Sequence, residues 1–368
     1  MKNTFGTAVS VTLFGESHGT AIGAVLDGLA PGIPVDEEQI AACLSLRRPQ
    51  DELSTARQEP DRFQIVSGVF EGKTTGTPLT VLIPNTDTRS RDYAATRALA
   101  RPGHADYTAH CKYHGFEDYR GGGHFSGRIT AALVAAGAIV RQALAVRGIT
   151  VGTHIRQCHG VEDRAFSSDP AALAAEIDAL STRTFPVLDE AAGDAMRAEI
   201  RAARAEQNSV GGVLETAVLG VPAGVGEPWF DTVEGVLSHA LFGIPAVKGV
   251  AFGSGFGFAG MTGKTANDPL RMQDGRVVTA TNHNGGVNGG ITNGMPLLFS
   301  CAVKPTPSIA APQQTVDILR GEDAALSIHG RHDPAVLHRA RIVVDCMTAL
   351  VLADLLAGRF GTDWLRAD

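Results

Sequence analysis

Cysteine is sparse and scattered in this chain of 368 residues. The five cysteines are odd in number, lie far apart and form no Cys-x-x-Cys pair: Cys43, Cys111, Cys158, Cys301 and Cys346. This pattern argues against a disulfide framework and against a zinc knuckle. It predicts reduced thiols in a cytoplasmic protein.

Long apolar runs and an excess of positive charge are also missing. The most apolar stretch, Ile129–Val140, is too short to span a bilayer and has Arg128 and Arg141 at its ends, which predicts a buried helix. The N-terminus lacks the apolar core of a signal peptide. A net charge of −7 and an aromatic content of 6% give no reason to expect nucleic-acid binding. We therefore expect a protein that binds neither membranes nor nucleic acids.

Glycine, in contrast, is abundant, and arginine is unevenly placed. The 43 glycines follow no collagen-like period, so they belong to many loops. Arginines gather in the first third of the sequence: Arg47, Arg48, Arg57, Arg62, Arg89, Arg91, Arg101, Arg120 and Arg128. A locally positive cleft in an acidic protein suits a small, multiply charged anion.

The segment 119–128, with sequence YRGGGHFSGR, is the most informative single motif. Three consecutive glycines carry a steep entropic cost, which a chain tolerates where its backbone must approach something closely. Arg120 and Arg128 flank the glycines, and a helix-forming run follows. Backbone N–H groups at a helix start, together with arginines, predict an anion pocket, most simply for phosphate. The alternative is a plain glycine loop with solvated arginines.

The order of elements favours an α+β fold over a strictly alternating parallel sheet, because strands often come in pairs before a helix. Asp36 with Gln39 predicts a helix start, and Gly148 predicts a helix end. Residues 84–127 read as one long irregular segment, which is typical of functional loops. Strands are expected at 9–14, 22–29, 62–70, 78–83, 212–221, 247–258, 276–280 and 296–303, and helices at 36–48, 128–148, 169–207 (broken near Pro186), 232–241 and 339–358.

Several further motifs could carry chemistry. His18 lies on a glycine-bounded turn, and His104 follows a rigid Arg-Pro-Gly sequence, so either imidazole could donate a proton to a leaving phosphate. The glycine-rich loop at 282–290 could wrap a cofactor, or it could be a wide hairpin loop. His104, His110 and His114 also permit a rival interpretation as a metal-dependent phosphohydrolase, although no acidic residue completes a His-Glu-x-x-His pattern.

The motifs taken together resemble the chorismate synthase family. The resemblance runs from about residue 5 to 350 and rests on seven short sequences: 14–19 (FGESHG), 47–49 (RRP), 101–106 (RPGHAD), 118–130 (DYRGGGHFSGRIT), 282–290 (NHNGGVNGG), 304–306 (KPT) and 330–334 (GRHDP). This chain has His124 and Phe125 where many members carry arginine and serine.

The resemblance implies a fold and a reaction. The fold would be one β-α-β sandwich over residues 1–368, with helices packed between antiparallel sheets, assembled as a homotetramer. The activity would be that of a lyase in the shikimate pathway. It eliminates phosphate and a ring proton from 5-enolpyruvylshikimate 3-phosphate in a 1,4-anti sense to give chorismate. Reduced FMN would be required, supplied by an external flavin reductase, with NADPH as an indirect electron source.

The resemblance also implies roles for individual residues. His18 would protonate the departing phosphate, His104 would stabilise the anionic reduced flavin, and Asp333 would accept or relay the proton at flavin N5. Ser17 and Ser126 would support these contacts. The substrate's carboxylates and phosphate would be held by Arg47, Arg48, Arg101 and Arg128, with Arg47 also meeting NADPH. FMN would lie against His124, Phe125, Ser126, Pro245, Ala246, Gly289, Lys304, Pro305, Thr306, Pro307, Ser308 and Arg331.

Overall fold

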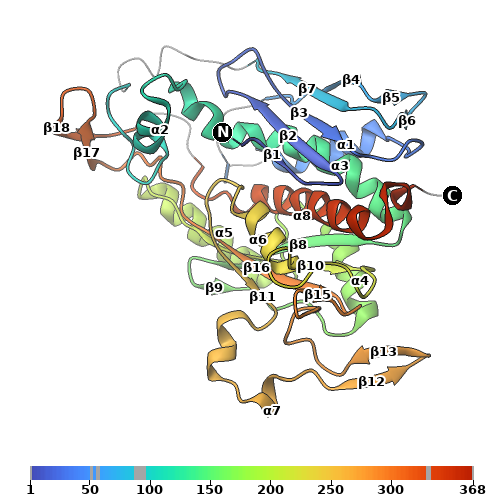
Figure 1. The fold of residues 1–368 in the computed structure, drawn as a ribbon. Helices are drawn as coiled ribbons and strands as arrows, with labels where there is room; N and C mark the ends of the chain where they lie inside the picture. The colour runs from blue at the N-terminus through green and yellow to red at the C-terminus, as the bar shows by residue number, and fades with distance from the viewer. Residues whose placement is uncertain (1, 50–52, 55–58, 87–96, 329–332, 367–368) are drawn as a thin grey trace.

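A computed structural model describes residues 2–49, 53–54, 59–86, 97–328 and 333–366 of the chain. Its core is three-layered, with helices between two antiparallel five-stranded sheets (Figure 1). The first sheet has the order β1 (Thr4–Phe5), β2 (Ser10–Gly15), β3 (Ala21–Asp27), β7 (Leu79–Pro84) and β4 (Gln64–Ser67). The second has the order β11 (Val247–Phe252), β16 (Leu297–Val303), β10 (Gly212–Leu219), β8 (Thr150–Cys158) and β9 (Val161–Glu162).

Three helices form the middle layer: α1 (Glu37–Arg47), α3 (Thr130–Val146) and α8 (Leu337–Phe360). Helix α3 is apolar on nearly every side, as a helix covered by protein all round must be. Residues 127–146 are long and apolar enough to cross a membrane, but 72% of an 18-residue window within them is buried inside the protein. At Gly137 a Cβ atom would lie 2.4 Å from Cβ of Cys346, so only glycine permits the close crossing of α3 and α8.

The remaining elements complete the fold around these three helices, and among them α6 packs against α8 and β11. The helices are α2 (Asp106–Tyr113), α4 (Pro170–Leu180), α5 (Glu190–Ala205), α6 (Val233–Leu241) and the short α7 (Gly263–Ala266). Four two-stranded ribbons pair β5 (Val69–Phe70) with β6 (Lys73–Thr74), β12 (Leu270–Gln273) with β13 (Arg276–Thr279), β14 (Val287–Asn288) with β15 (Ile291–Thr292), and β17 (Gln313–Asp317) with β18 (Glu322–Leu326).

The α+β prediction is confirmed, with specific errors in its elements. Asp36 caps α1 by accepting from the backbone N–H groups of Glu38 and Gln39, as predicted. The strand expected to reach residue 258 stops at Phe252, because Gly253 and Gly255 have positive φ and a 3₁₀ turn follows. The sequence pattern missed β8, whose buried face includes His154, and it missed α2 and the β17–β18 ribbon.

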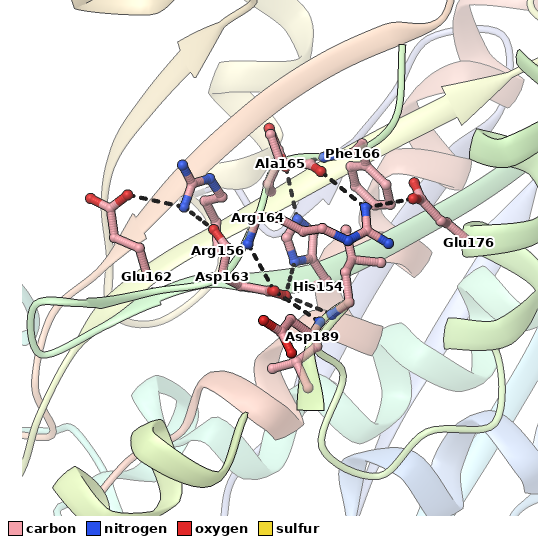
Figure 2. Close-up of polar contacts among 12 residues, drawn as sticks. His154, Arg156, Glu162, Asp163, Arg164, Ala165, Phe166, Glu176 and Asp189 are labelled. Carbon is pink, nitrogen blue, oxygen red and sulfur yellow. Dashed lines mark hydrogen bonds and ion pairs between the residues drawn. The ribbon is translucent and has the colours of Figure 1, made fainter. Parts of the chain in front are cut away.

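A buried histidine ties the second sheet to the loops outside it (Figure 2). His154 of β8 contacts Asp163 through Nδ1 at 3.0 Å and Glu215 of β10 through Nε2 at 2.8 Å. The Asp163 carboxylate also accepts from the backbone N–H groups of Leu188 and Asp189, at the start of α5. Burial alone would lower the pKa of His154, but the hydrogen bonds to the two carboxylates outweigh burial and raise it.

This raised pKa predicts a pH-dependent stability. A native state that binds the His154 proton more tightly is stabilised below the ordinary pKa of 6.5, and the gain is lost as pH rises through the native value. We expect His154→Gln to lower the free energy of unfolding in urea, with the largest difference from wild type below pH 6.5 and a shrinking one above it.

The matched control is His159→Gln, because His159 pairs with Glu199 at the surface and is 62% exposed. Exposed ion pairs contribute at most about 1 kcal/mol. A His154 effect that stays constant between pH 5 and pH 9, or that equals the control, would contradict this assignment.

Candidate functional site

A cavity of about 1470 Å³ opens among β2, the 3₁₀ segment Arg120–Phe125, α3, α8 and the loops before α2 and after β16. Its described wall carries eight lysine or arginine side chains against six aspartate or glutamate side chains, in a chain of net charge −7. Three imidazoles, those of His18, His104 and His124, share the wall. A locally positive cavity of this kind attracts anions.

The three glycines let the backbone pack directly against two of these imidazoles. Gly121, Gly122 and Gly123 all have positive φ. A Cβ atom on Gly121 would lie 2.4 Å from Cε1 of His18, and one on Gly122 would lie 3.1 Å from Cε1 of His104. The predicted close approach is therefore present, and its immediate partners are the two predicted catalytic histidines.

Asp61 joins two arginines beneath the cavity. Its carboxylate is 2.9 Å from Nη2 of Arg47, the last residue of α1, and in closer contact with Nη1 of Arg128, just before α3. All three side chains are buried. Burial alone would raise the pKa of Asp61, but the guanidinium groups of Arg47 and Arg128 outweigh burial and hold it below its usual value.

Arg128 also supports the turn that carries His18. Nε of Arg128 donates to Oδ1 of Asn85 at 3.0 Å. The amide nitrogen of Asn85 in turn donates to the carbonyl oxygens of Glu16 and Gly19, at 2.9 Å each. Ser17 is fully buried behind this turn, and its N–H donates to the carbonyl of Gly123 at 3.0 Å. Arginine, amide and turn thus form one connected support for His18.

His104 is oriented by Asp106. Nδ1 of His104 lies 2.7 Å from Oδ1 of Asp106, and since a carboxylate only accepts, this nitrogen carries the hydrogen. Nε and Nη2 of Arg101 also donate to Asp106, at 2.7 and 2.8 Å. Burial would raise the pKa of Asp106, but these hydrogen bonds outweigh it and leave the pKa well below its usual range. Nε2 of His104 is the nitrogen left to face a ligand.

The loop after β16 closes one side of the cavity against the His104 loop. The ammonium of Lys304 donates to the carbonyl of Gly103, and Nη1 of Arg101 lies 3.4 Å from Oγ of Ser308. Elsewhere in the wall, Asp333 accepts from Nη1 of Arg339 at 2.6 Å. Nε of Arg339 donates to the carbonyl of Arg47 at 2.8 Å, which links the end of α1 to the start of α8.

Most of the predicted site residues converge on this cavity. Its wall contains His18, Arg47, Arg48, Arg101, His104, His124, Phe125, Ser126, Arg128, Pro245, Ala246, Lys304, Thr306, Pro307, Ser308 and Asp333. Arg331 lies outside the described residues. Ser17 and Pro305 lie behind the wall rather than in it.

Gly289 differs from the others, because it sits in the β14–β15 turn and does not line the cavity. The neighbouring Gly290 accepts a backbone hydrogen bond from Val233 at the start of α6. Gly285 and Gly286 pack against the backbone of Gly253 and Pro296. This glycine-rich loop packs as a structural turn outside the described cavity wall, and the expected contact of Gly289 with FMN stays a prediction.

The three histidines of the rival metal site are not brought together. His104 faces the main cavity, whereas His110 contacts Glu117 at 3.3 Å beside a separate small pocket. His114 ends α2 in the left-handed conformation. Within the described ranges, no three His, Cys, Asp or Glu side chains cluster closely enough to hold a metal ion.

The sequence analysis gave no role to several residues that position the cations and the His18 turn. Asp61, Asn85 and Arg339 had no assigned role, and the Asp106 carboxylate was noted only as part of a motif. Their partners lie up to 292 residues away in sequence, as for the bond from Arg339 to Arg47. The only local signal was the spacing of Asp106, two residues after His104 on a rigid loop.

Fold and site together define an α+β sandwich protein with a cation-rich cavity beside two oriented imidazoles. The sequence profile described as chorismate synthase matches residues 9–357. Chorismate synthase of Opitutus terrae is 48% identical over 356 residues, covering 96% of each chain. That of Thermococcus gammatolerans is 49% identical over 354 residues, 96% of this chain and 97% of the relative. This chain belongs to the chorismate synthase family.

A solved structure supports the same conclusion. A crystal structure of chorismate synthase superimposes with a TM-score of 0.77 at 28% identity, covering 97% of this chain and 94% of that chain. The resemblance read from the short motifs is therefore confirmed across nearly the whole chain. Membership of the chorismate synthase family also disfavours the alternative of a metal-dependent phosphohydrolase.

The Asp61 pairing yields a prediction for stability. Asp61→Asn removes the charge that compensates Arg47 and Arg128, and breaking a buried pair by removing one partner costs about 3–5 kcal/mol. We expect a loss of this size in urea unfolding at pH 7. The control is Asp194→Asn at the exposed pair with Arg197, for which we expect less than about 1 kcal/mol. Equal losses in both variants would refute a central role for Asp61.

Proposed function

We propose that this protein converts 5-enolpyruvylshikimate 3-phosphate to chorismate and phosphate, by 1,4-anti elimination. In this reaction a ring C–H bond and a C–O bond to phosphate break, and a second ring double bond forms. The observation that carries the proposal is the single cavity in which His18, His104 and four predicted substrate arginines meet. The substrate bears a phosphate and two carboxylates, so a cavity rich in guanidinium groups matches its charge.

The residues present fit the FMN that the family implies. The cavity is large enough for a flavin and a sugar-like acid together, and it combines apolar surface from Phe125, Pro245 and Ala246 with cations. Among the described residues, Oγ1 of Thr306 and Nε of Arg47 are buried in this wall without a hydrogen-bond partner. Buried polar atoms normally find partners, and a bound ligand would supply them.

Reduced FMN, when bound, would supply the electron density needed to expel phosphate from a ring whose C–H bond is not acidic. The protein's own part is charge, orientation and proton handling. The substrate's anionic groups are held by Arg48, Arg101 and the part of Arg47 that lines the cavity. His18 donates a proton to the phosphate oxygen as the C–O bond breaks, which makes phosphate a better leaving group.

His104 and Asp333 are the two other groups that we expect to handle protons or charge during the reaction. His104 keeps its Nδ1 hydrogen on Asp106, and with Nε2 also protonated it would donate a hydrogen bond to the flavin and favour negative charge there. Asp333, held by Arg339, would accept or relay the proton at flavin N5. Ser126 accepts from the N–H of Arg128 and fixes the start of the helix beside these groups.

The protein is proposed to act as a cytoplasmic homotetramer, with FMN reduced by a separate reductase. The β12–β13 ribbon supports self-association, because it projects away from the second sheet (Figure 1) and exposes Leu270, Met272 and Val277 by 58–72%. Exposed apolar side chains gathered on one ribbon are typical of protein interfaces. The NADPH contact of Arg47 stays a prediction. In this structure Nη2 of Arg47 pairs with Asp61.

The proposal predicts phosphate release without oxygen. Purified protein mixed anaerobically with 5-enolpyruvylshikimate 3-phosphate and chemically reduced FMN should release one phosphate for each chorismate formed. Oxidised FMN should support no turnover. Absence of phosphate release with reduced FMN would contradict the proposal.

His104→Ala tests the site itself. We expect kcat to fall by about 100-fold or more, the usual scale for a positioned proton-handling group, while the urea midpoint stays near wild type. His159→Ala, at an exposed surface pair, is the matched control and should keep wild-type turnover. Unchanged turnover in His104→Ala would show that the assigned role is wrong.

A further inference from the structure

Asn85 follows β7 directly and lies in none of the short family motifs. Its backbone N–H donates to the carbonyl of Thr20 at 3.1 Å, which continues the antiparallel pairing of β3 and β7 beyond Ala21 and Pro84. The main chain therefore fixes the place from which the Asn85 side chain extends. Asn85 is not part of the described cavity wall, so it can influence a reaction there only through the groups that it holds.

The contact with Arg128 determines which way the Asn85 amide points. A guanidinium group can only donate hydrogen bonds, so Oδ1 of Asn85 is the atom that accepts from Nε of Arg128 at 3.0 Å. The amide nitrogen then faces the other way, and its two hydrogens match the carbonyl oxygens of Glu16 and Gly19, each 2.9 Å away. Arg128 is itself buried and paired with Asp61, so a fixed group holds the amide. One conformation of Asn85 thus satisfies a buried cation and two backbone acceptors at once.

These two carbonyl groups bracket His18 in the sequence. The N–H of Gly19 also donates to the carbonyl of Glu16 at 3.1 Å, which closes the turn around Ser17 and His18. The imidazole of His18 is only 8% exposed and packs against Gly121. A small movement of the turn therefore moves the imidazole relative to the cavity, because the turn carries the Cα atom of His18.

Asn85→Asp would separate the two tasks of the amide. A carboxylate has nearly the same shape and would still accept from Arg128, but neither of its oxygens can donate to the carbonyls of Glu16 and Gly19. Two backbone acceptors would lose their partner and would face a negatively charged oxygen. We expect the His18 turn to shift away from β7, while the sheets and the helical layer keep their contacts.

We propose that Asn85 is a positioning residue for the elimination, and that it fixes His18 where the imidazole can transfer its proton to the departing phosphate oxygen. The inference rests on the proposed function for the role of His18. Reacting groups must meet within a narrow range of distance and angle, and a displacement of about 1 Å can cost about 100-fold in rate. The two hydrogen bonds from the Asn85 amide keep the turn within that range.

Labelling of histidines tests the hold on His18 without any substrate. Full-length protein is treated with diethyl pyrocarbonate, and the modified histidines are mapped over time by mass spectrometry. In Asn85→Asp we expect His18 to react about tenfold faster than in wild type, because the loss of two hydrogen bonds favours local opening of the turn. His104, which Asp106 orients, should keep its rate. Unchanged labelling of His18 would overturn the proposal.

Asn208→Asp is the matched control. Asn208 is exposed, and its Oδ1 accepts from the N–H of Ser209 at 2.9 Å, a bond that aspartate can also make. Asn85→Ala is a second test variant, since it removes the two donated hydrogen bonds without adding a charge beside Arg128. Both Asn85 variants should unfold cooperatively in urea and should show faster labelling at His18. An equal increase at every histidine in both variants would indicate general unfolding and would contradict the proposal.

A double-variant cycle connects this hold to turnover. With reduced FMN, Asn85→Asp should lower kcat about 100-fold while KM stays near wild type, because Asn85 does not line the cavity. In a His18→Ala background the same substitution should change kcat by less than about twofold, since the group that it positions is already gone. An equal loss in both backgrounds would show a purely structural role and would overturn the proposal. If wild type releases no phosphate, the proposed function fails, whereas the labelling still decides whether Asn85 holds His18.

Discussion

The buried carboxylate of Asp61 between Arg47 and Arg128 is the constraint on which the site depends. Two guanidinium groups cannot be buried side by side without a counter-charge, because the desolvation of each ion costs several kcal/mol. Asp61 supplies that charge and at the same time fixes the end of α1 against the start of α3. Through Asn85, the same cluster reaches the turn of His18. An electrostatic requirement thus helps to set the position of the His18 turn.

The glycine triplet packs against two imidazole rings, and its predicted role in binding phosphate stays a prediction. Its backbone forms a surface on which His18 and His104 rest, and no side chain fits between. Asp106 orients the imidazole of His104 through a hydrogen bond. Asn85 holds the backbone turn that carries His18. Groups fixed in this way need little reorganisation when charge develops in a reaction, which is the main electrostatic advantage of an active site.

The middle layer contains more charge than its apolar sequence suggests. Asp345 of α8 accepts from Thr153 of β8 at 2.6 Å and contacts Arg341, and burial raises its pKa. Thr153 also bonds Thr216 of β10, so the carboxylate ties α8 to two strands of the second sheet. Arg141 reaches Cys43 in the same region. This buried polar network joins α3 and α8, two helices that begin at the cavity, to the second sheet.

The sequence by itself determined the fold class, most helices and strands, and the short motifs around His18, His104 and Asp333. These features are local, because capping residues, hydrophobic period and glycine turns act over a few residues. Only the tertiary structure decided which charges neutralise one another and where the glycine loop at 282–290 lies. Such contacts join residues such as Asp61 and Arg128, or Arg47 and Arg339, that are far apart along the chain. Their energy depends on burial and distance, which no local pattern records.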